Sequence, residues 1–176
     1  IGEIRDLETA EIAVQSALTG HLALSTVHTN DAASTMNRLL DMGVEDYLLT
    51  STVVGVLAQR LVRTLCPHCK EPHAARPEIV EQMRLDRFAK VKEITLYRPM
   101  GCAQCAHTGY TGRISIMEML PISDPMRSLV MKHGTASDLR NEAIREGMLT
   151  MYEDGLRKAV RGITTLEEVL RVTRES

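Results

Sequence analysis

The sequence predicts an α/β fold that carries an inserted cysteine-containing module and ends in a small helical subdomain. Three observations support this prediction. Helix-like and strand-like patterns alternate over about the first sixty residues, as in a mostly parallel sheet whose strands are joined by helices. All four cysteines fall between residues 64 and 113. Beyond them the pattern is mainly helical, in short pieces separated by glycines. We therefore divide the chain into residues 1–63, 64–113 and 114–176.

The first segment is predicted to contain a strand, a helix and a second strand. Ile1–Ile4 has the pattern of a strand end, and because the sequence begins with Ile rather than Met, we expect a fragment of a longer protein. Asp6 is in position to cap a helix that Gly20 ends. Residues 21–27 (HLALSTV) are short, apolar and bounded by turn residues, which indicates a buried strand.

Two further helices are expected before the cysteines. Asn30 or Asp31 is in position to cap the first of them, and Gly43 follows its last apolar residues. An apolar pattern from about Asp46 to Gln59 predicts the second helix.

The last segment is predicted to begin with a strand and to continue as helices. Thr165 and Glu168 have the spacing of a capping box, which predicts the start of the final helix.

The cysteines form two CxxC pairs separated by about thirty residues: Cys66, Cys69, Cys102 and Cys105. Two residues between cysteines let a tight turn direct both thiolates at one cation, and two such turns supply the four sulfur ligands of a tetrahedral Zn²⁺ site. Four thiolates leave no position for water, so we expect structural zinc. A redox-active pair needs only one CxxC, and disulfides are disfavoured in the reducing compartment expected for a chain without a secretory signal.

Other residues of the cysteine segment could take part in the metal site. His68, His73 and His107 could each replace a thiolate, but a polar residue of an exposed module is the simpler explanation of each. Three basic residues near the cysteines are suited to offset the negative charge of a four-thiolate centre: Lys70, Arg98 and Arg113.

The composition argues against nucleic-acid binding. The formal net charge is −2 and the isoelectric point is about 6.3, so no overall basic field attracts a phosphate backbone. One Phe, four Tyr and no Trp leave few aromatic side chains on which bases could stack. Because no targeting signal and no uninterrupted apolar stretch of membrane-spanning length is evident, we expect a cytoplasmic protein.

Glu3 and His28 are predicted to lie close together. If Ile1–Ile4 and residues 21–27 are neighbouring parallel strands, a right-handed crossover brings both side chains to the carboxyl edge of the sheet, where open α/β sheets bind ligands. A carboxylate beside an imidazole, with Thr29 at a helix N-terminus, suits a phosphate-bearing ligand and its attacking water. From the residues alone, ordinary surface polarity is the simpler explanation.

Four stretches of sequence change this balance. They are GEIRD at residues 2–6 with ETA at 8–10, TGH at 19–21 with STVHTNDA at 25–32, AQRLVR at 58–63 and GYTGR at 109–113. In this order they resemble the secretion ATPase superfamily, which powers type II secretion and type IV pilus assembly. The resemblance covers essentially the whole chain. The tetracysteine element indicates the secretion or pilus-assembly branch, since the retraction ATPases lack it.

The resemblance implies that residues 1–63 belong to a RecA-like P-loop ATPase core, and that the complete protein uses ATP and Mg²⁺. Glu3 matches the Walker B glutamate, which is expected to polarise the attacking water. His28 matches the histidine-box residue, which is expected to contact the γ-phosphate region. Gly2, Arg5 and Thr29 are expected to contribute to nucleotide binding.

The resemblance also implies a cellular role. ATP hydrolysis would be coupled to pseudopilin assembly and to protein export across the outer membrane. The complete protein is expected to be a homohexamer that binds the inner-membrane platform and adaptor proteins of the secretion machine. It would lie peripherally on the cytoplasmic face of the bacterial inner membrane.

One motif of the family, the P-loop GxxxxGK[ST], does not occur in the 176 residues. We expect it upstream, and we expect the fragment alone to hydrolyse ATP at no meaningful rate. Two alternatives stay open, namely a pilus assembly ATPase and a zinc-ribbon module that binds proteins without catalysis. For Arg60 and Arg63 two interpretations are open: charges that flank a strand and are exposed or paired with acids, and contacts to nucleotide or a neighbouring subunit.

Overall fold

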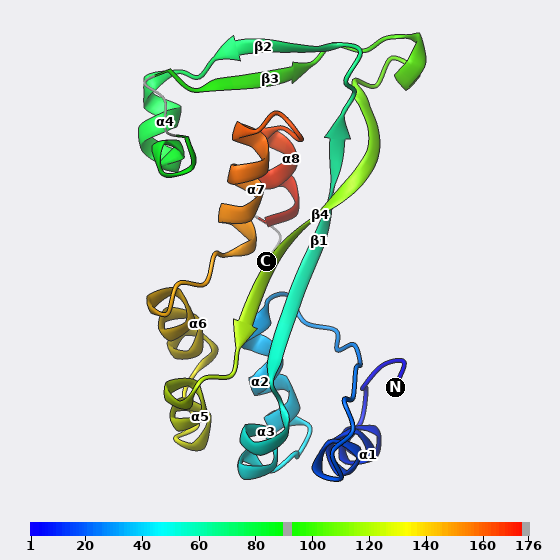
Figure 1. Ribbon diagram of the computed structural model, residues 1–176, viewed down its shortest axis with the longest axis vertical. Coiled ribbons are helices and arrows are strands. Elements are labelled where there is room, and N and C mark those ends of the chain that lie inside the picture. The colour runs from blue at the N-terminus through cyan, green and yellow to red at the C-terminus, as the bar shows by residue number, and fades with distance from the viewer. Residues whose placement is uncertain (90–92, 174–176) are drawn as a thin grey trace. The chain divides into compact units, whose positions relative to one another are not determined.

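The computed structural model describes residues 1–89 and 93–173. They fold into two compact units, which are described one at a time. The first unit consists of Ile1–Ala58 and Glu118–Met148, and the second of Gln59–Met117 and the chain from Leu149 onward. Strands β1 (Gly55–Leu65) and β4 (Tyr110–Pro121) pair with each other, and each has residues in both units (Figure 1).

Helices form most of the first unit. They are α1 (Leu7–Leu18), α2 (Ala32–Asp41), α3 (Asp46–Thr52), α5 (Asp124–Met131) and α6 (Ala136–Arg145). Their apolar faces share one core with the end of β4. The fully buried side chains of this core include Met36, Leu49, Leu120, Met126 and Leu139. This core fixes the start of α2, next to the predicted site.

The predicted helix starts of the first unit are confirmed. The carboxylate of Asp6 caps α1 by accepting from the N–H of Thr9, at 2.8 Å. Asp31 caps α2 in the same way, with the N–H of Ser34 at 2.7 Å. The helices end just before Gly20 and Gly43, as the sequence predicts. These contacts satisfy helix N–H groups that have no partner within the helix.

The buried strand predicted at residues 21–27 is wrong. The segment is extended, but its two leucines are exposed, by 78% at Leu22 and 74% at Leu24, and only Val27 at its end is partly buried against the core. Among the described residues, its main-chain hydrogen bonds are one from His21 to Ser16, at the end of α1, and two with residues 1–4. Two bonds to one neighbouring segment do not make a strand ladder, and none of the described residues covers Leu22 and Leu24.

The helix predicted from Asp46 to Gln59 is also wrong in its length. It ends at Thr52, and β1 begins at Gly55. Because β-branched side chains crowd this stretch, an extended backbone is favoured after Thr52. The carbonyl of Val54 already accepts from the N–H of Ile122, at 3.1 Å.

The mostly parallel sheet is not found among the assigned strands. The described residues form two two-stranded sheets, β1 with β4 and β2 (Lys70–Ala74) with β3 (Thr95–Pro99). β2 and β3 are antiparallel, and β1 and β4 run in opposite directions in Figure 1. Parallel pairing is limited to the two extended segments near the N-terminus.

The second unit combines the cysteine segment with the last two helices. Besides β2 and β3 it contains α4 (Pro77–Met83), α7 (Met151–Val160), α8 (Leu166–Thr173) and the short 3₁₀ helices η1 (Leu85–Phe88) and η2 (Ala103–Cys105). One core serves both parts, since Leu85 and Leu96 of the cysteine segment pack in the same cluster as Leu156 and Val169 of α7 and α8.

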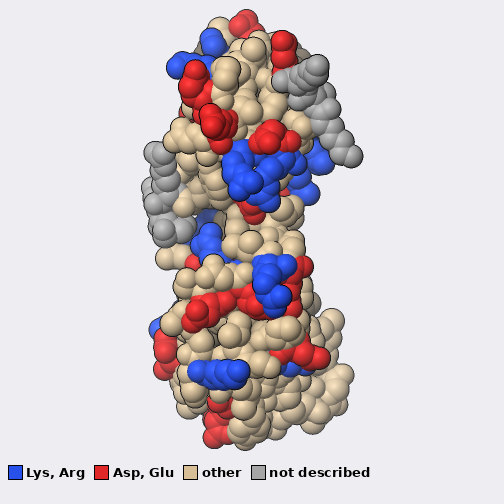
Figure 2. All heavy atoms as spheres, turned by 90° about the vertical axis from the view of Figure 1, so that its left-hand side faces the viewer, with Lys and Arg blue, Asp and Glu red and all other residues tan. Residues whose placement is uncertain are grey.

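The charged side chains are mixed on the surface. On the face displayed in Figure 2, Lys and Arg side chains lie among Asp and Glu side chains rather than forming one continuous basic area. None of the helices in the described part of the chain has the length and hydrophobicity needed to cross a bilayer.

Candidate functional site

Two extended segments near the N-terminus run parallel and in contact. The N–H of Ile4 donates to the carbonyl of Thr26 at 2.8 Å, and the amino group of Ile1 donates to the carbonyl of Leu24 at 3.1 Å. The hydroxyl of Thr26 donates to the carbonyl of Gly2 at 2.9 Å. This pairing places the ends of the two segments side by side, as the sequence predicts.

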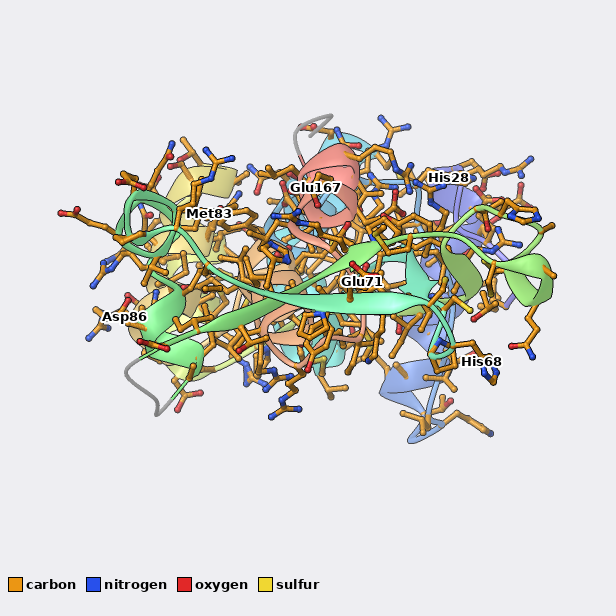
Figure 3. All side chains as sticks on the ribbon, turned by 90° about the horizontal axis from the view of Figure 1, so that it is seen from above. His28, His68, Glu71, Met83, Asp86 and Glu167 are labelled. Carbon is orange, nitrogen blue, oxygen red and sulfur yellow. The ribbon has the colours of Figure 1, made fainter. Side chains whose placement is uncertain are left out.

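Glu3 and His28 are brought together at these ends. Nε2 of His28 lies 2.9 Å from Oε1 of Glu3, and Nη2 of Arg5 lies 2.5 Å from Oε2. The Glu3 side chain is 20% exposed, whereas that of His28 is 88% exposed, so the imidazole lies at the surface (Figure 3). The hydrogen bond from Arg5 and the nearby His28 lower the pKa of Glu3. Glu3 is therefore a carboxylate at neutral pH, with an imidazole against one oxygen.

The loop after His28 leads directly into α2. The hydroxyl of Thr29 lies 2.8 Å from the hydroxyl of Thr35, so Thr29 is engaged with the first turn of the helix. Its expected contribution to nucleotide binding stays a prediction. The same holds for Gly2, whose carbonyl accepts from Thr26.

Glu118 is a buried residue of this region that the sequence analysis missed. Its Oε1 accepts from the N–H of Ala32, the first residue of α2, at 2.8 Å. A signal was present in the alternation of β4, where Met117 and Met119 are exposed and Glu118 is only 5% exposed. A charged residue on the inward side of a strand, between outward methionines, reverses the usual arrangement.

The four predicted metal ligands form one cluster. The Sγ atoms of the cysteines all lie within 4.8 Å of one another. Cys66 and Cys102 are 3.9 Å apart, and Cys69 and Cys105 are 3.8 Å apart. Four thiolates about 2.3 Å from a tetrahedral metal ion would be about 3.8 Å apart, whereas a disulfide needs about 2.05 Å. The donor set therefore fits one metal ion and excludes disulfides.

Backbone N–H groups point at the sulfurs. Burial raises the pKa of the Cys69 thiol to about 12, and a single N–H, that of Gly101, opposes this effect. Cys105 is more deeply buried than Cys69, but it accepts from the N–H groups of Cys102 and Gly109, and its pKa falls to about 6. Such donors stabilise thiolates and are typical of CxxC turns that hold a metal.

The other residues considered for the cysteine site lie outside the cluster. Among the described residues, the group able to hold a metal consists of the four cysteines. His68 and His107 are exposed, and Figure 3 shows His68 at the surface, next to the start of β2. The Nζ of Lys70 donates to the carbonyl of Gly162 at 2.7 Å and lies over the ring of Tyr97.

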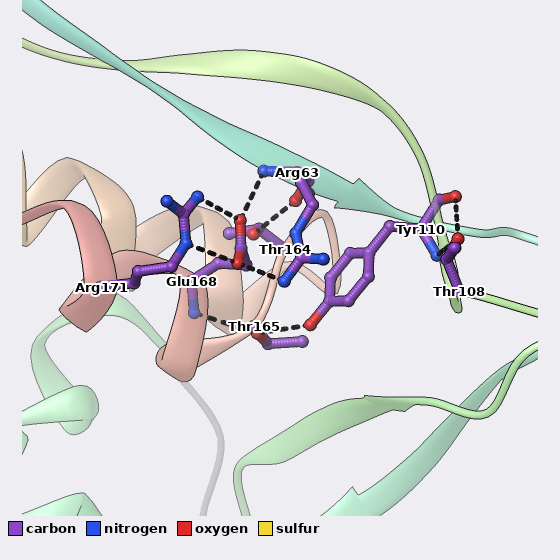
Figure 4. Close-up of polar contacts among 7 residues, drawn as sticks. All are labelled: Arg63, Thr108, Tyr110, Thr164, Thr165, Glu168 and Arg171. Atoms are coloured by element: carbon purple, nitrogen blue, oxygen red, sulfur yellow. Dashed lines mark hydrogen bonds and ion pairs between the residues drawn. The ribbon is translucent and has the colours of Figure 1, made fainter.

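Arg63 is paired within the second unit (Figure 4). Its guanidinium lies 2.6 Å from Oε1 of Glu168, and its N–H donates to Oε2 at 2.9 Å. Arg171 binds the same carboxylate through two bonds of 2.9 Å. Burial alone would raise the pKa of Glu168, but the two arginines lower it to about 2. Of the two interpretations of Arg63, pairing with an acid is the one observed.

Comparison with known proteins identifies the family. The type II/IV secretion system protein family matches residues 1–171. The chain belongs to this family. It is 58% identical over 176 residues to the type II secretion system protein E of Xanthomonas campestris pv. campestris, covering all of this chain and 31% of that protein. It is 51% identical over 177 residues to the type II secretion system ATPase E of Vibrio cholerae, covering all of this chain and 34% of that protein.

Pilus proteins of the family are also similar to this chain. The type IV pilus assembly ATPase PilB of Thermus thermophilus is 48% identical over 175 residues, which cover 99% of this chain and 20% of that protein. The chain therefore spans about a third or less of the length of these relatives. Their names make the family one of secretion and pilus ATPases.

Solved structures of an ATPase and of a pilus retraction motor have a similar α/β fold. The ATPase DotB of Legionella pneumophila superposes with a TM-score of 0.62 at 20% identity, covering 99% of this chain and 38% of that one. The pilus retraction motor PilT with bound ADP gives a TM-score of 0.61 at 23% identity, covering 97% and 38%. At these identities the likeness concerns the fold alone.

Proposed function

We propose that the chain is the C-terminal part of a hexameric motor ATPase of type II secretion. ATP hydrolysis by the complete protein would be coupled to pseudopilin assembly and to protein export across the outer membrane. The contact between Glu3 and His28, at the ends of two parallel segments, is the observation that carries this proposal. Membership of a family of secretion and pilus ATPases supports it.

Glu3 is the proposed catalytic residue. Because Arg5 and His28 keep it ionised, its carboxylate is ready to orient and polarise the water that attacks the γ-phosphate. His28 lies against the same carboxylate and would contact the γ-phosphate region. Gly2, Arg5 and Thr29 are proposed to lie along the nucleotide. Mg²⁺, when bound with ATP, neutralises charge on the phosphates.

The four cysteines are proposed to hold one structural Zn²⁺. Zinc prefers four thiolates in a tetrahedral arrangement, and the sulfur separations of this cluster agree with that preference. Bound zinc would join the turn before β2 to the turn before β4, which are far apart in the sequence.

The complete protein is proposed to work as a homohexamer on the cytoplasmic face of the inner membrane, where it would bind the platform and adaptor proteins of the secretion machine. The type II secretion names of several relatives support this assignment.

Replacement of Glu3 by Gln in the complete protein tests the proposal. The amide keeps the size of the side chain but cannot accept a proton, so turnover should fall at least 100-fold while nucleotide affinity stays within threefold. Isothermal titration with a non-hydrolysable ATP analogue and a phosphate-release assay measure the two quantities. Glu11→Gln, at an exposed position of α1, is the control. Turnover of Glu3→Gln close to that of the unmodified protein would contradict the assignment.

Pilus assembly is the second candidate function, favoured by the 48% identity with PilB of Thermus thermophilus. Complementation separates the two. The gene should restore protein export to a type II secretion mutant and should not restore piliation to a pilus assembly mutant. The reverse result would assign the chain to pilus assembly.

A further inference from the structure

Glu118 lies where a strand normally carries an apolar residue. On β4 the inward positions next to it are Ile116 and Leu120, both fully buried, and Glu118 itself is 5% exposed. Placing a carboxylate in such surroundings is costly unless specific hydrogen bonds stabilise it. A hydrogen bond of this kind joins Glu118 to the start of α2.

The partner of Glu118 is an N–H that the helix itself cannot satisfy. The first N–H groups of an α-helix have no acceptor within the helix, and Ala32 is the first residue of α2. Ala32 is fully buried, so water cannot replace the missing acceptor. Oε1 of Glu118 fills this role at 2.8 Å, from 86 residues away in the sequence.

This contact lies four residues after His28. Between them, Asp31 caps α2 and the hydroxyl of Thr29 contacts that of Thr35. These contacts join the loop to its own helix. Glu118, in contrast, joins the start of α2 to β4, at a residue of β4 that belongs to the first unit. Glu118 therefore sets where α2 begins relative to the sheet, and with it the position of His28.

We propose that Glu118 is a positioning residue for the pair formed by Glu3 and His28. It acts through the N–H of Ala32 and touches neither nucleotide nor reacting atoms. This inference rests on the proposed function, since it assumes that the pair serves catalysis. Loss of the contact would let His28 move relative to Glu3, and errors of about 1 Å in such groups reduce turnover by up to about 100-fold.

Two substitutions of Glu118 separate the effect of side-chain length from the effect of its negative charge. Glu118→Gln keeps the length of the side chain and an oxygen that can accept from Ala32, but it removes the charge. Glu118→Asp keeps the charge, but it is one methylene shorter and cannot span the same distance. The proposal predicts that kcat of Glu118→Gln stays within about threefold of the unmodified value, and that kcat of Glu118→Asp falls about 10- to 100-fold with unchanged nucleotide affinity.

The experiment uses the complete protein and three measurements: kcat, affinity for a non-hydrolysable ATP analogue, and hydrogen exchange of peptides that cover residues 28–36. The amide of Ala32 should exchange faster in Glu118→Asp than in Glu118→Gln. Asp138→Ala is the matched control, because Asp138 accepts from a backbone N–H at the start of α6 in the same unit. It should lower the melting temperature without changing kcat.

The outcomes are distinct. Equal kcat for Glu118→Asp and the unmodified protein overturns the proposal, and so does a loss of kcat in Glu118→Gln that matches or exceeds the loss in Glu118→Asp. If Glu118→Asp does not fold, Glu118→Gln still decides, since a fall in its kcat beyond threefold contradicts the proposal. The proposed function is judged separately by Glu3→Gln and His28→Ala. If both keep full turnover, the catalytic pair is wrong, and the positioning role is overturned with it.

Discussion

Gly109 contacts both cysteine pairs, and its backbone conformation leaves little choice of residue. Its N–H donates to Sγ of Cys105 at 3.2 Å, and its carbonyl accepts from the N–H of Cys66 at 2.9 Å. It has φ +78°, and a Cβ at this position would lie 2.4 Å from Cβ of Pro99. Two constraints, a left-handed backbone and a close neighbour, therefore act on one residue.

Gly109→Ala is expected to weaken metal binding at least tenfold and to destabilise the protein by more than about 2 kcal/mol, because both constraints are violated. Gly112→Ala is the control, since Gly112 has φ +69° but open space around it, and should cost about 1 kcal/mol. Competition with a chromophoric chelator and urea unfolding measure the two effects. Equal effects of both substitutions would show that the contact with Pro99 is unimportant.

For single residues, the sequence predicts which side chains form the candidate sites better than it predicts which residues hold those side chains in place. The cysteines and the contact between Glu3 and His28 follow from spacing and from the parallel geometry of two segments, both of which are local properties. Glu118 could not be found in this way, because its partner Ala32 is 86 residues away. Only its place on the inward side of β4 distinguishes it from a surface glutamate.

Among the elements, α8 depends on one buried carboxylate. Glu168 is 2% exposed and binds Arg63 of β1 and Arg171 of α8. Its pKa is about 2 in the folded protein, against a usual value of 4.5. Because folding lowers this pKa, the stabilisation is fully present above about pH 4.5 and is lost as the pH falls toward 2.

Glu168→Gln is therefore expected to destabilise the protein by about 1–3 kcal/mol at pH 7, a range that allows for the partial exposure of both arginines. The difference from the unmodified protein should shrink as the pH falls below 4.5. Urea unfolding from pH 7 to pH 3 measures this. Glu167→Gln is the control, because Glu167 is exposed on the same helix (Figure 3). A difference that stays constant with pH would contradict the assignment.

Helix starts were predictable because a cap acts within three residues, as at Asp6 and Asp31. Thr165 also caps α8, accepting from the N–H of Glu168 at 3.2 Å. The carboxylate of Glu168, however, binds the two arginines instead of completing the predicted capping box. Strands depend on partners elsewhere in the chain, which explains why the prediction for residues 21–27 was wrong.

At the scale of the whole molecule, metal binding should stabilise one unit and not the other. Leu65 and Lys70, the residues on either side of the first cysteine pair, hydrogen-bond to the turn between α7 and α8, where the carbonyl of Gly162 accepts from Lys70 and that of Ile163 accepts from Leu65. The cysteine segment and these helices also share a core. No cysteine lies in the first unit.

The purified protein should contain one zinc per chain by elemental analysis. Removal by a strong chelator should increase hydrogen exchange in β2, β3, α7 and α8, because they pack with the cysteine turns, while α1, α2 and α5 stay protected. Added Zn²⁺ should restore protection. Protein prepared without chelator and lacking metal, or exchange that rises equally in both units, would contradict this prediction.

The exposed segment at residues 21–27 also affects how this chain behaves when it is produced by itself. The described residues form no strand ladder with this extended backbone, and Leu22 and Leu24 on it are exposed; such segments are where separate molecules join edge to edge. Aggregation during purification would then arise from this segment, even with both cores intact. Lysine at position 22 or 24, the residue that natural edge strands use against such pairing, is the change that would improve solubility.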